Sequence, residues 1–192
     1  MLKSLVLGTL LGGLVAFVWS SISWEILGWH EKSVLSFQHD EEVSAAISSH
    51  TVISGVYILP GAPSTERMSS EQKKVAQATL VEKMRKGPVM FAAIQRDGFG
   101  SYARGLIIQC LSLMAAAFLL TWLVMQTGGL SYGKRVIFLG VVGLAASVIS
   151  DLPNWNWWGF SGGYTVVMMA DATVTWLLAG LVIAKVAKPR AV

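Results

Sequence analysis

Long apolar runs separated by shorter polar stretches dominate the pattern of this chain. Three runs reach the length of about 20 residues that an α-helix needs to cross a bilayer; they are Ser4–Ile22, Gly105–Gln126 and Tyr164–Ala184. A fourth run, Val136–Ser150, gives only about 22 Å of helix at about 1.5 Å per residue. It therefore needs its flanking residues, a thinned bilayer or a re-entrant path. We interpret it as a full span, because an even number of crossings fits the charges described below.

The polar stretch between the first two runs contains signals for two short helices. Asp40–His50 begins with acidic residues and places apolar residues at helical spacing, which favours a helix. A second helix is predicted from Ser69 or Ser70 to about Lys86, because Gln72 follows Ser69 at the spacing of a capping box.

Two strands are predicted on either side of that second helix. Val52–Leu59 and Val89–Gln95 are rich in β-branched and apolar residues and are bounded by Pro and Gly. The order strand, helix, strand predicts a right-handed crossover with parallel strands. Two strands alone form a marginal sheet, so we expect the membrane surface to help cover it.

Basic residues near the ends of the apolar runs predict how the chain crosses the membrane. Positively charged residues concentrate on the cytoplasmic side of membrane proteins. Such residues lie before the first apolar run along the chain, between the second and the third, and after the last one. They are Lys3, Lys134, Arg135, Lys185, Lys188 and Arg190. The sequence therefore predicts a multi-pass protein of the bacterial inner membrane with both termini in the cytoplasm.

Together these patterns predict an all-α membrane protein: a four-helix transmembrane bundle with a small α/β periplasmic domain between helices 1 and 2. The predicted parts are a first transmembrane helix at 1–23, the periplasmic α/β domain at 24–104, and transmembrane helices 2 to 4 at 105–192 with an aromatic outer loop at 151–163. Met1 to Lys3 and the following run resemble a signal peptide, but the run is too long and lacks a clear cleavage site. We expect an uncleaved anchor.

Composition supports the membrane class and argues against several others. The chain of 192 residues is 54% hydrophobic and 14% charged, which leaves too little polar surface for a soluble domain. The net charge of +4 comes from dispersed basic residues, so we expect no nucleic-acid partner. The single cysteine, Cys110, excludes a disulfide framework and a haem-attachment motif. No cofactor is expected.

Small residues recur at every fourth position of the first apolar run: Gly8, Gly12, Ala16 and Ser20. Such a stripe lets another helix approach closely. The helix it receives belongs either to the same bundle or to a homo-oligomer or another membrane protein.

Asp171 is an acidic residue inside the last apolar run. A charge at the centre of a membrane helix is costly, so such a residue is normally paired, protonated or turned inward. Thr175, one turn later, is in position to donate a hydrogen bond to it. Two interpretations stay open: a proton or cation relay, or a carboxyl group that links helices.

A second group of candidates lies between the third and fourth runs. Pro153 is expected to end the third helix. The residues around it suit either an aromatic anchor at the outer interface or a pocket for a lipid headgroup, a sugar or a quinone ring; they are Asp151, Asn154, Trp155, Asn156, Trp157 and Trp158, with Phe160.

The three histidines, His30, His39 and His50, show no spacing typical of a zinc site. His30 with Glu25 and Asp151 is one hypothesis for an acid/base or metal site at the outer surface. No metal site is predicted from the spacing itself.

The function expected from these features is that of a non-catalytic membrane protein whose outer domain and aromatic loop bind a protein partner or a lipid-like ligand. The first alternative is a small proton- or cation-coupled transporter that uses Asp171. The second is an envelope enzyme acting on a lipid headgroup, although the sequence contains no G-x-S-x-G elbow.

Overall fold

The computed structural model describes residues 1–187, and the chain divides into two units. The helical unit contains residues 1–35, 101–155 and, from residue 160, the rest of the described chain. The small unit contains Ser36–Gly100 and Asn156–Gly159. Each unit is described by itself.

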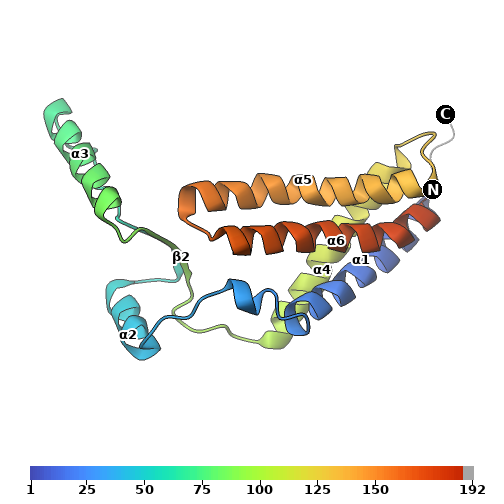
Figure 1. Cartoon of the computed structure of the whole chain (residues 1–192), viewed down its shortest axis with the longest axis horizontal. Coiled ribbons are helices and arrows are strands. Elements are labelled where there is room, and N and C mark those ends of the chain that lie inside the picture. Colours follow the sequence, from blue (N-terminus) through green and yellow to red (C-terminus); the bar gives the residue numbers. More distant parts are fainter. Residues whose placement is uncertain (188–192) are drawn as a thin grey trace. The chain divides into compact units, whose positions relative to one another are not determined.

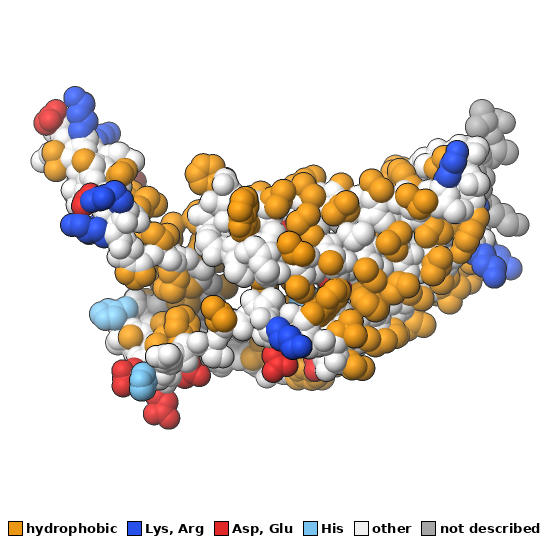
Figure 2. All heavy atoms as spheres, in the orientation of Figure 1, with side chains coloured by type: hydrophobic (Ala, Val, Ile, Leu, Met, Phe, Trp, Pro, Cys, Tyr) orange, Lys and Arg blue, Asp and Glu red, His pale blue; other side chains and the backbone are white. Residues whose placement is uncertain are grey.

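Four long helices form the helical unit (Figure 1). They are α1 (Leu2–Glu25), α4 (Tyr102–Met125), α5 (Tyr132–Trp158) and α6 (Gly162–Val186), and each is long and apolar enough to cross a membrane. Hydrophobic side chains cover the visible flank of this unit (Figure 2), as expected of a surface that faces lipid. The prediction of four helices long and apolar enough to cross a membrane, as in a multi-pass membrane protein, is confirmed.

The third span is a full-length helix, because residues on both sides of the apolar run extend it. Helix α5 has 27 residues, which corresponds to about 40 Å at about 1.5 Å per residue. The prediction that Pro153 ends this helix is wrong. Proline removes only one backbone donor, and such a loss is tolerated in membrane helices. The helix continues to Trp158, and Gly159, with φ of +76°, begins the turn into α6.

The aromatic segment is therefore mostly helical and not a loop. Asp151–Trp158 forms the end of α5, and only residues 159–161 join α5 to α6. The predicted loop 151–163 is thus replaced by a helix end and a tight connection.

Small residues bring the helices of this unit together. Gly12 lies against Ile183 of α6 and Ala117 of α4, and Gly8 lies against Thr121 of α4. With Ala16, these glycines are buried in the chain's own core. Gly8, Gly12 and Ala16 therefore pack within the bundle, whereas Ser20 is half-buried.

Four basic residues of the described chain lie at one end of the helical unit, whereas Lys32 and Arg104 follow α1 and begin α4. Tyr132 Oη donates to the carbonyl of Leu181 at 3.0 Å, and Arg135 Nη1 donates to the carbonyl of Ala187 at 2.6 Å. The start of α5 thus lies beside the end of α6, at the same end as the N-terminus (Figure 1). The basic residues Lys3, Lys134, Arg135 and Lys185 belong to this end, whereas Lys188 and Arg190 lie outside the described residues.

The small unit contains α2 (Asp40–His50), β1 (Gly55–Leu59), α3 (Ser70–Lys86) and β2 (Met90–Ile94). Both predicted helices are confirmed. The capping box is present: Ser69 Oγ accepts from the Gln72 amide, and the Gln72 side chain accepts from the Ser69 amide. Both strands form but are shorter than predicted.

The expected parallel pairing of the two strands is wrong. Strands β1 and β2 are antiparallel, with a register from Gly55 opposite Ile94 to Leu59 opposite Met90. A parallel crossover requires the intervening helix to pack on the sheet and carry the chain back along it. No residue of α3 is buried, so the chain instead leaves and re-enters the sheet at the same end, as in a hairpin.

Candidate functional site

Asp171 lies on the face of α6 that packs into the helical unit. It is 8% exposed, and buried residues follow it at every fourth position: Thr175, Ala179 and Ile183. This spacing places all four on one side of the helix. Asp171 stands about 13 Å along α6 from Gly162, at about 1.5 Å per residue, so its carboxyl group is within a membrane-length helix.

Three side chains surround the Asp171 carboxyl group, two of them as hydrogen-bond donors. Trp19 Nε1 donates to Oδ1 at 2.7 Å, and Ser23 Oγ donates to the same oxygen at 2.8 Å. His30 Nε2 lies 3.3 Å from Oδ2. Both carboxylate oxygens are thus engaged, which offsets the cost of removing the group from water.

The geometry at the end of α1 explains how these donors converge. Trp19 and Ser23 are one turn apart on α1 and point to the same side. The helix ends at Glu25, and Gly28 then adopts φ of +63°, a left-handed conformation that glycine reaches without strain. The reversal returns His30 to the last turn of α1, where Ser23 Oγ is 3.1 Å from His30 Nε2.

The hydrogen-bond network reaches His30 through a single ring nitrogen, Nε2. Ser23 Oγ has one proton, which it gives to Asp171, and it accepts a hydrogen bond from Trp29 Nε1 at 2.9 Å. His30 Nε2 lies 3.1 Å from Ser23 Oγ and 3.3 Å from Asp171 Oδ2, and its tautomer decides whether it donates or accepts there. His30 Nδ1 is buried and has no hydrogen-bond partner among residues 1–187.

Aromatic rings enclose the imidazole. Trp24 stacks on His30 with ring centroids 3.9 Å apart and planes 6° from parallel, and Trp29 meets it edge-on at 5.5 Å. His30 is 2% exposed as a result. The site is a closed polar network, which we call the Asp171 network: Trp19, Ser23, Trp29, His30 and Asp171.

The arrangement lacks the geometry of a nucleophilic triad. In a triad, histidine accepts the serine proton at one ring nitrogen while the carboxylate holds the other. Here Ser23 and Asp171 share the same nitrogen of His30, Ser23 gives its proton to Asp171, and Ser23 is fully buried. Within residues 1–187, no group of three or more His, Cys, Asp or Glu side chains is placed to hold a metal ion.

The structure separates several residues that the sequence hypotheses had combined. Thr175 Oγ1 donates to the backbone carbonyl of Asp171 at 2.7 Å, not to its carboxylate. Asp151 accepts from Ser147 on its own helix. Glu25 accepts from Tyr102 Oη at 3.2 Å. The hypothesis that His30, Glu25 and Asp151 form one site is therefore not supported, and His30 pairs with Asp171 instead.

The tryptophans of α5 do not take part in the Asp171 network. Trp155 and Trp157 are exposed, and Trp158 stacks on Phe91 with centroids 4.5 Å apart. Asn154 and Asn156 lie on the same helix end, where Asn154 is half-buried and Asn156 exposed. The remaining histidines belong to the small unit, with His39 just before α2 and His50 in its last turn.

Sequence reasoning missed Trp19, Ser23 and Trp29 as members of the site. One signal was present: Gly12, Ala16, Trp19 and Ser23 follow each other at alternating spacings of four and three, which is the repeat of one buried helix face. Extending the face of Gly12 and Ala16 to the end of the helix would have predicted that Trp19 and Ser23 face the other helices of the bundle.

Comparison of the chain with protein-family models, with curated proteins and with solved structures found no match.

Proposed function

We propose that this chain is a non-catalytic integral protein of the bacterial inner membrane that presents its small unit, together with the tryptophan-rich end of α5, on the periplasmic side to bind a protein partner or a lipid-like ligand. The basic end of the helical unit supports this orientation, because positive residues favour the cytoplasm. Residues 36–100 would then emerge from the opposite end of the bundle.

Helix α3 carries this proposal. It has 17 residues and a complete capping box at its start, yet none of its residues is buried. Its apolar side chains Val75, Val81 and Met84 are exposed. An isolated helix of this length is only marginally stable in water, so a surface that packs against it would stabilise it.

The charges of α3 indicate the chemistry of that partner. Its basic side chains outnumber its two acidic ones, Glu71 and Glu82; the basic residues are Lys73, Lys74, Lys83, Arg85 and Lys86. A protein surface that combines an apolar strip with acidic residues complements this helix. We therefore favour a protein partner for α3.

Site-specific photo-crosslinking in native membranes tests this proposal. A photoreactive amino acid at Val75 or Val81 should give one discrete adduct with another protein, and reversing the charges of Lys83 and Lys86 should weaken it several-fold. The control position is Leu119, which is exposed on membrane helix α4. Absence of any adduct from α3, or equal adducts from α3 and Leu119, would overturn the proposal.

Proton-coupled transport is a second candidate, supported by the buried pair of His30 and Asp171. Ionisable groups within membrane helices commonly belong to proton relays. Purified protein in liposomes with an internal pH dye provides the test. Proton flux should disappear in Asp171→Asn and His30→Gln and persist in Thr173→Ala, whose hydroxyl contacts only its own helix backbone. Equal flux in all these proteins and in empty liposomes would exclude transport.

A further inference from the structure

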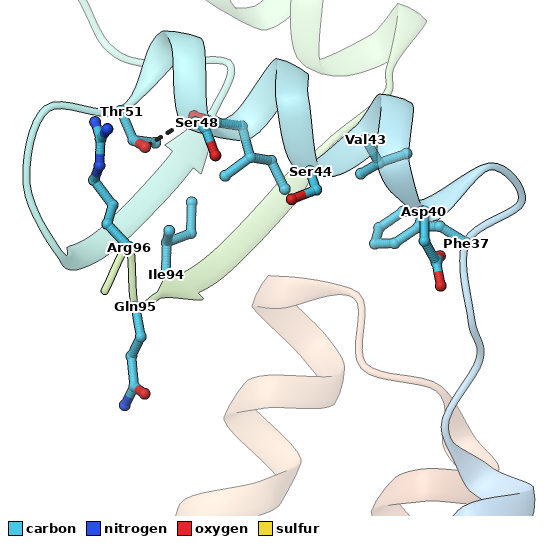
Figure 3. Close-up of a pocket in the computed structure, with 10 residues that line it drawn as sticks. Phe37, Asp40, Val43, Ser44, Ser48, Thr51, Ile94, Gln95 and Arg96 are labelled. Atoms are coloured by element: carbon cyan, nitrogen blue, oxygen red, sulfur yellow. Dashed lines mark hydrogen bonds between the residues drawn. The ribbon is translucent and has the colours of Figure 1, made fainter. Parts of the chain in front are cut away.

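A groove borders α2 and the end of β2, and all the residues that line it belong to the small unit. The lining residues from α2 and its C-cap are Asp40, Val43, Ser44, Ile47, Ser48 and Thr51. Their spacing places them on one face of the helix along its whole length. Ile94 of β2 also lines the groove and points toward α2 (Figure 3). We call this the α2 groove.

The middle of the α2 groove is apolar and accessible. Val43, Ile47 and Ile94 are half-buried. No residue of α2 is buried, so the helix does not close onto the sheet. Phe37, which also lines the groove, is 65% exposed. These side chains therefore offer apolar surface to an occupant.

The size of the groove selects an extended occupant. Helix α2 has 11 residues, which corresponds to about 16 Å, and the groove has a volume of about 300 Å³. A second helix of that length, about 10 Å wide, would fill on the order of 1,000 Å³. An extended chain covers the same length with about five residues at about 3.3 Å each. The groove is therefore too narrow for a helix and suits a single extended chain.

Two hydroxyl groups favour a peptide over a purely apolar chain. Ser44 and Ser48 are exposed, one turn apart, and form no side-chain hydrogen bond within residues 1–187. Every residue of a bound peptide carries a backbone donor and acceptor that need partners. Serine hydroxyls supply both functions.

Opposite charges stand at the two ends of the groove. Figure 3 shows Asp40 at one end of the row of lining residues and Arg96 at the other. Neither side chain forms an ion pair within the described residues. A basic residue near Asp40 and an acidic residue near Arg96 would complement these charges.

We propose that the α2 groove binds an extended peptide segment of another protein, with small apolar side chains on Val43, Ile47 and Ile94 and residues of opposite charge about five positions apart. This site goes beyond partner binding by α3, since it is a different surface. It depends neither on α3 nor on the orientation of the chain in the membrane.

Three dye-labelled hexapeptides with blocked termini test this proposal on the full chain in phosphatidylcholine nanodiscs. Valine and serine alternate at their inner positions, and the two end residues are lysine and glutamate, two glutamates or two lysines. In fluorescence anisotropy, the chain should bind the peptide with lysine and glutamate several-fold more tightly than the other two, as expected of one exposed ion pair.

Charge reversal at one end of the groove should change this order. Asp40→Lys makes both ends positive, so this variant should bind the peptide with two glutamates several-fold more tightly than the other two. Unfolding cannot produce such a reversal. The matched control is Glu41→Lys, the same change at the next, exposed position of α2, which does not line the groove. It should keep the original order.

Three other results would overturn the proposal. Equal binding of all three peptides to the unaltered chain would show apolar adhesion that ignores the charges. The same change of order in Asp40→Lys and Glu41→Lys would show long-range electrostatics without a site. Absence of binding would show that the groove does not accept a peptide. Crosslinking from α3 is measured separately, so failure here leaves the α3 proposal standing.

Discussion

At the residue scale, the unusual feature is a carboxylate within a membrane helix that receives hydrogen bonds from groups distant in sequence. Trp19 and Ser23 hold Oδ1 of Asp171, and His30 approaches Oδ2. The Asp171 network thereby ties the end of α1 and the following turn to α6. This satisfies the demand that a buried polar group be hydrogen-bonded.

Replacing Asp171 should reveal how much of the fold depends on this network. Asp171→Ala leaves the donors of Trp19, Ser23 and His30 buried without an acceptor, so we expect a loss of about 2 to 5 kcal/mol in the free energy of unfolding. Asp171→Asn keeps an acceptor for Trp19 and Ser23 but presents N–H to His30, so the loss should be about 1 to 2 kcal/mol. Unfolding in detergent or bicelles, followed by tryptophan fluorescence, measures both.

Thr173→Ala is the matched control on the same helix, because Thr173 donates only to the carbonyl of Met169. Equal stabilities of the alanine variant at 171 and this control would mean that the Asp171 network contributes nothing to the fold.

At the element scale, close approach of helices depends on positions without a side chain. On α5, Gly143 faces α6, and a Cβ there would lie 2.9 Å from the carbonyl oxygen of Ala172 and 2.7 Å from Trp176 Cδ1. Gly133, on the same helix, has nothing within 4 Å of its Cβ position. Gly143 is therefore needed for close packing of α5 on α6, whereas Gly133 is not, although both glycines are helical.

Gly143→Ala should destabilise the bundle by about 1 to 3 kcal/mol, because the added methyl group pushes α5 from α6. Gly133→Ala should be neutral or slightly stabilising, since alanine favours the helix by up to about 1 kcal/mol. Thermal denaturation monitored by size-exclusion chromatography compares them. Equal melting temperatures for the two variants would contradict the close α5–α6 packing.

The ion pairs on α3 allow a pH prediction. Arg85 and Lys86, each 3.2 Å from the Glu82 carboxylate, lower the pKa of Glu82 below its usual value. Because the folded-state pKa is the lower one, the ion pairs stabilise α3 above the unfolded pKa, and this contribution is lost as the pH falls through the folded pKa.

A carboxyl ¹³C NMR titration checks this prediction. The midpoint of Glu82 should rise toward the value of an unfolded peptide when Arg85 and Lys86 are both replaced by glutamine. The same midpoint in both proteins would show that these ion pairs do not form in solution.

At the scale of the whole molecule, the four spans and the basic end together predict the orientation in the membrane. The start of α5 is fastened to the end of α6 by Tyr132 and Arg135, so the described charges that are predicted to be cytoplasmic, Lys3, Lys134, Arg135 and Lys185, share one end of the helical unit. A single choice of orientation therefore satisfies all of them.

Reporter fusions test that orientation. A fusion after Lys134 should report the cytoplasm, and one near Ser64 should report the periplasm, because positive residues resist translocation. Lys134→Glu should weaken the preference without affecting the hydrogen bond of Arg135. A cytoplasmic reporter at Ser64 would overturn the proposed topology.

The sequence by itself determined the features that depend on local chemistry. Apolar runs of spanning length identified three of the four membrane helices, since the bilayer imposes that length on any helix that crosses it. The fourth, around Val136–Ser150, was predicted because an even number of crossings fits the positions of the basic residues. The capping box at Ser69 and Gln72 located the start of α3, because its hydrogen bonds join residues three apart. The prediction that Pro153 ends the third helix was wrong, because whether a proline ends a helix depends on the surroundings of that helix.

The tertiary structure alone decided which distant residues meet. The partnership of His30 with Asp171 needs the reversal at Gly28 and the packing of α1 against α6, neither of which the residue types specify. The antiparallel direction of β1 and β2 follows from α3 not packing on the sheet, although a strand, helix and strand in sequence equally permit a crossover. Local signals act over a few residues, whereas these outcomes depend on which surfaces are buried together.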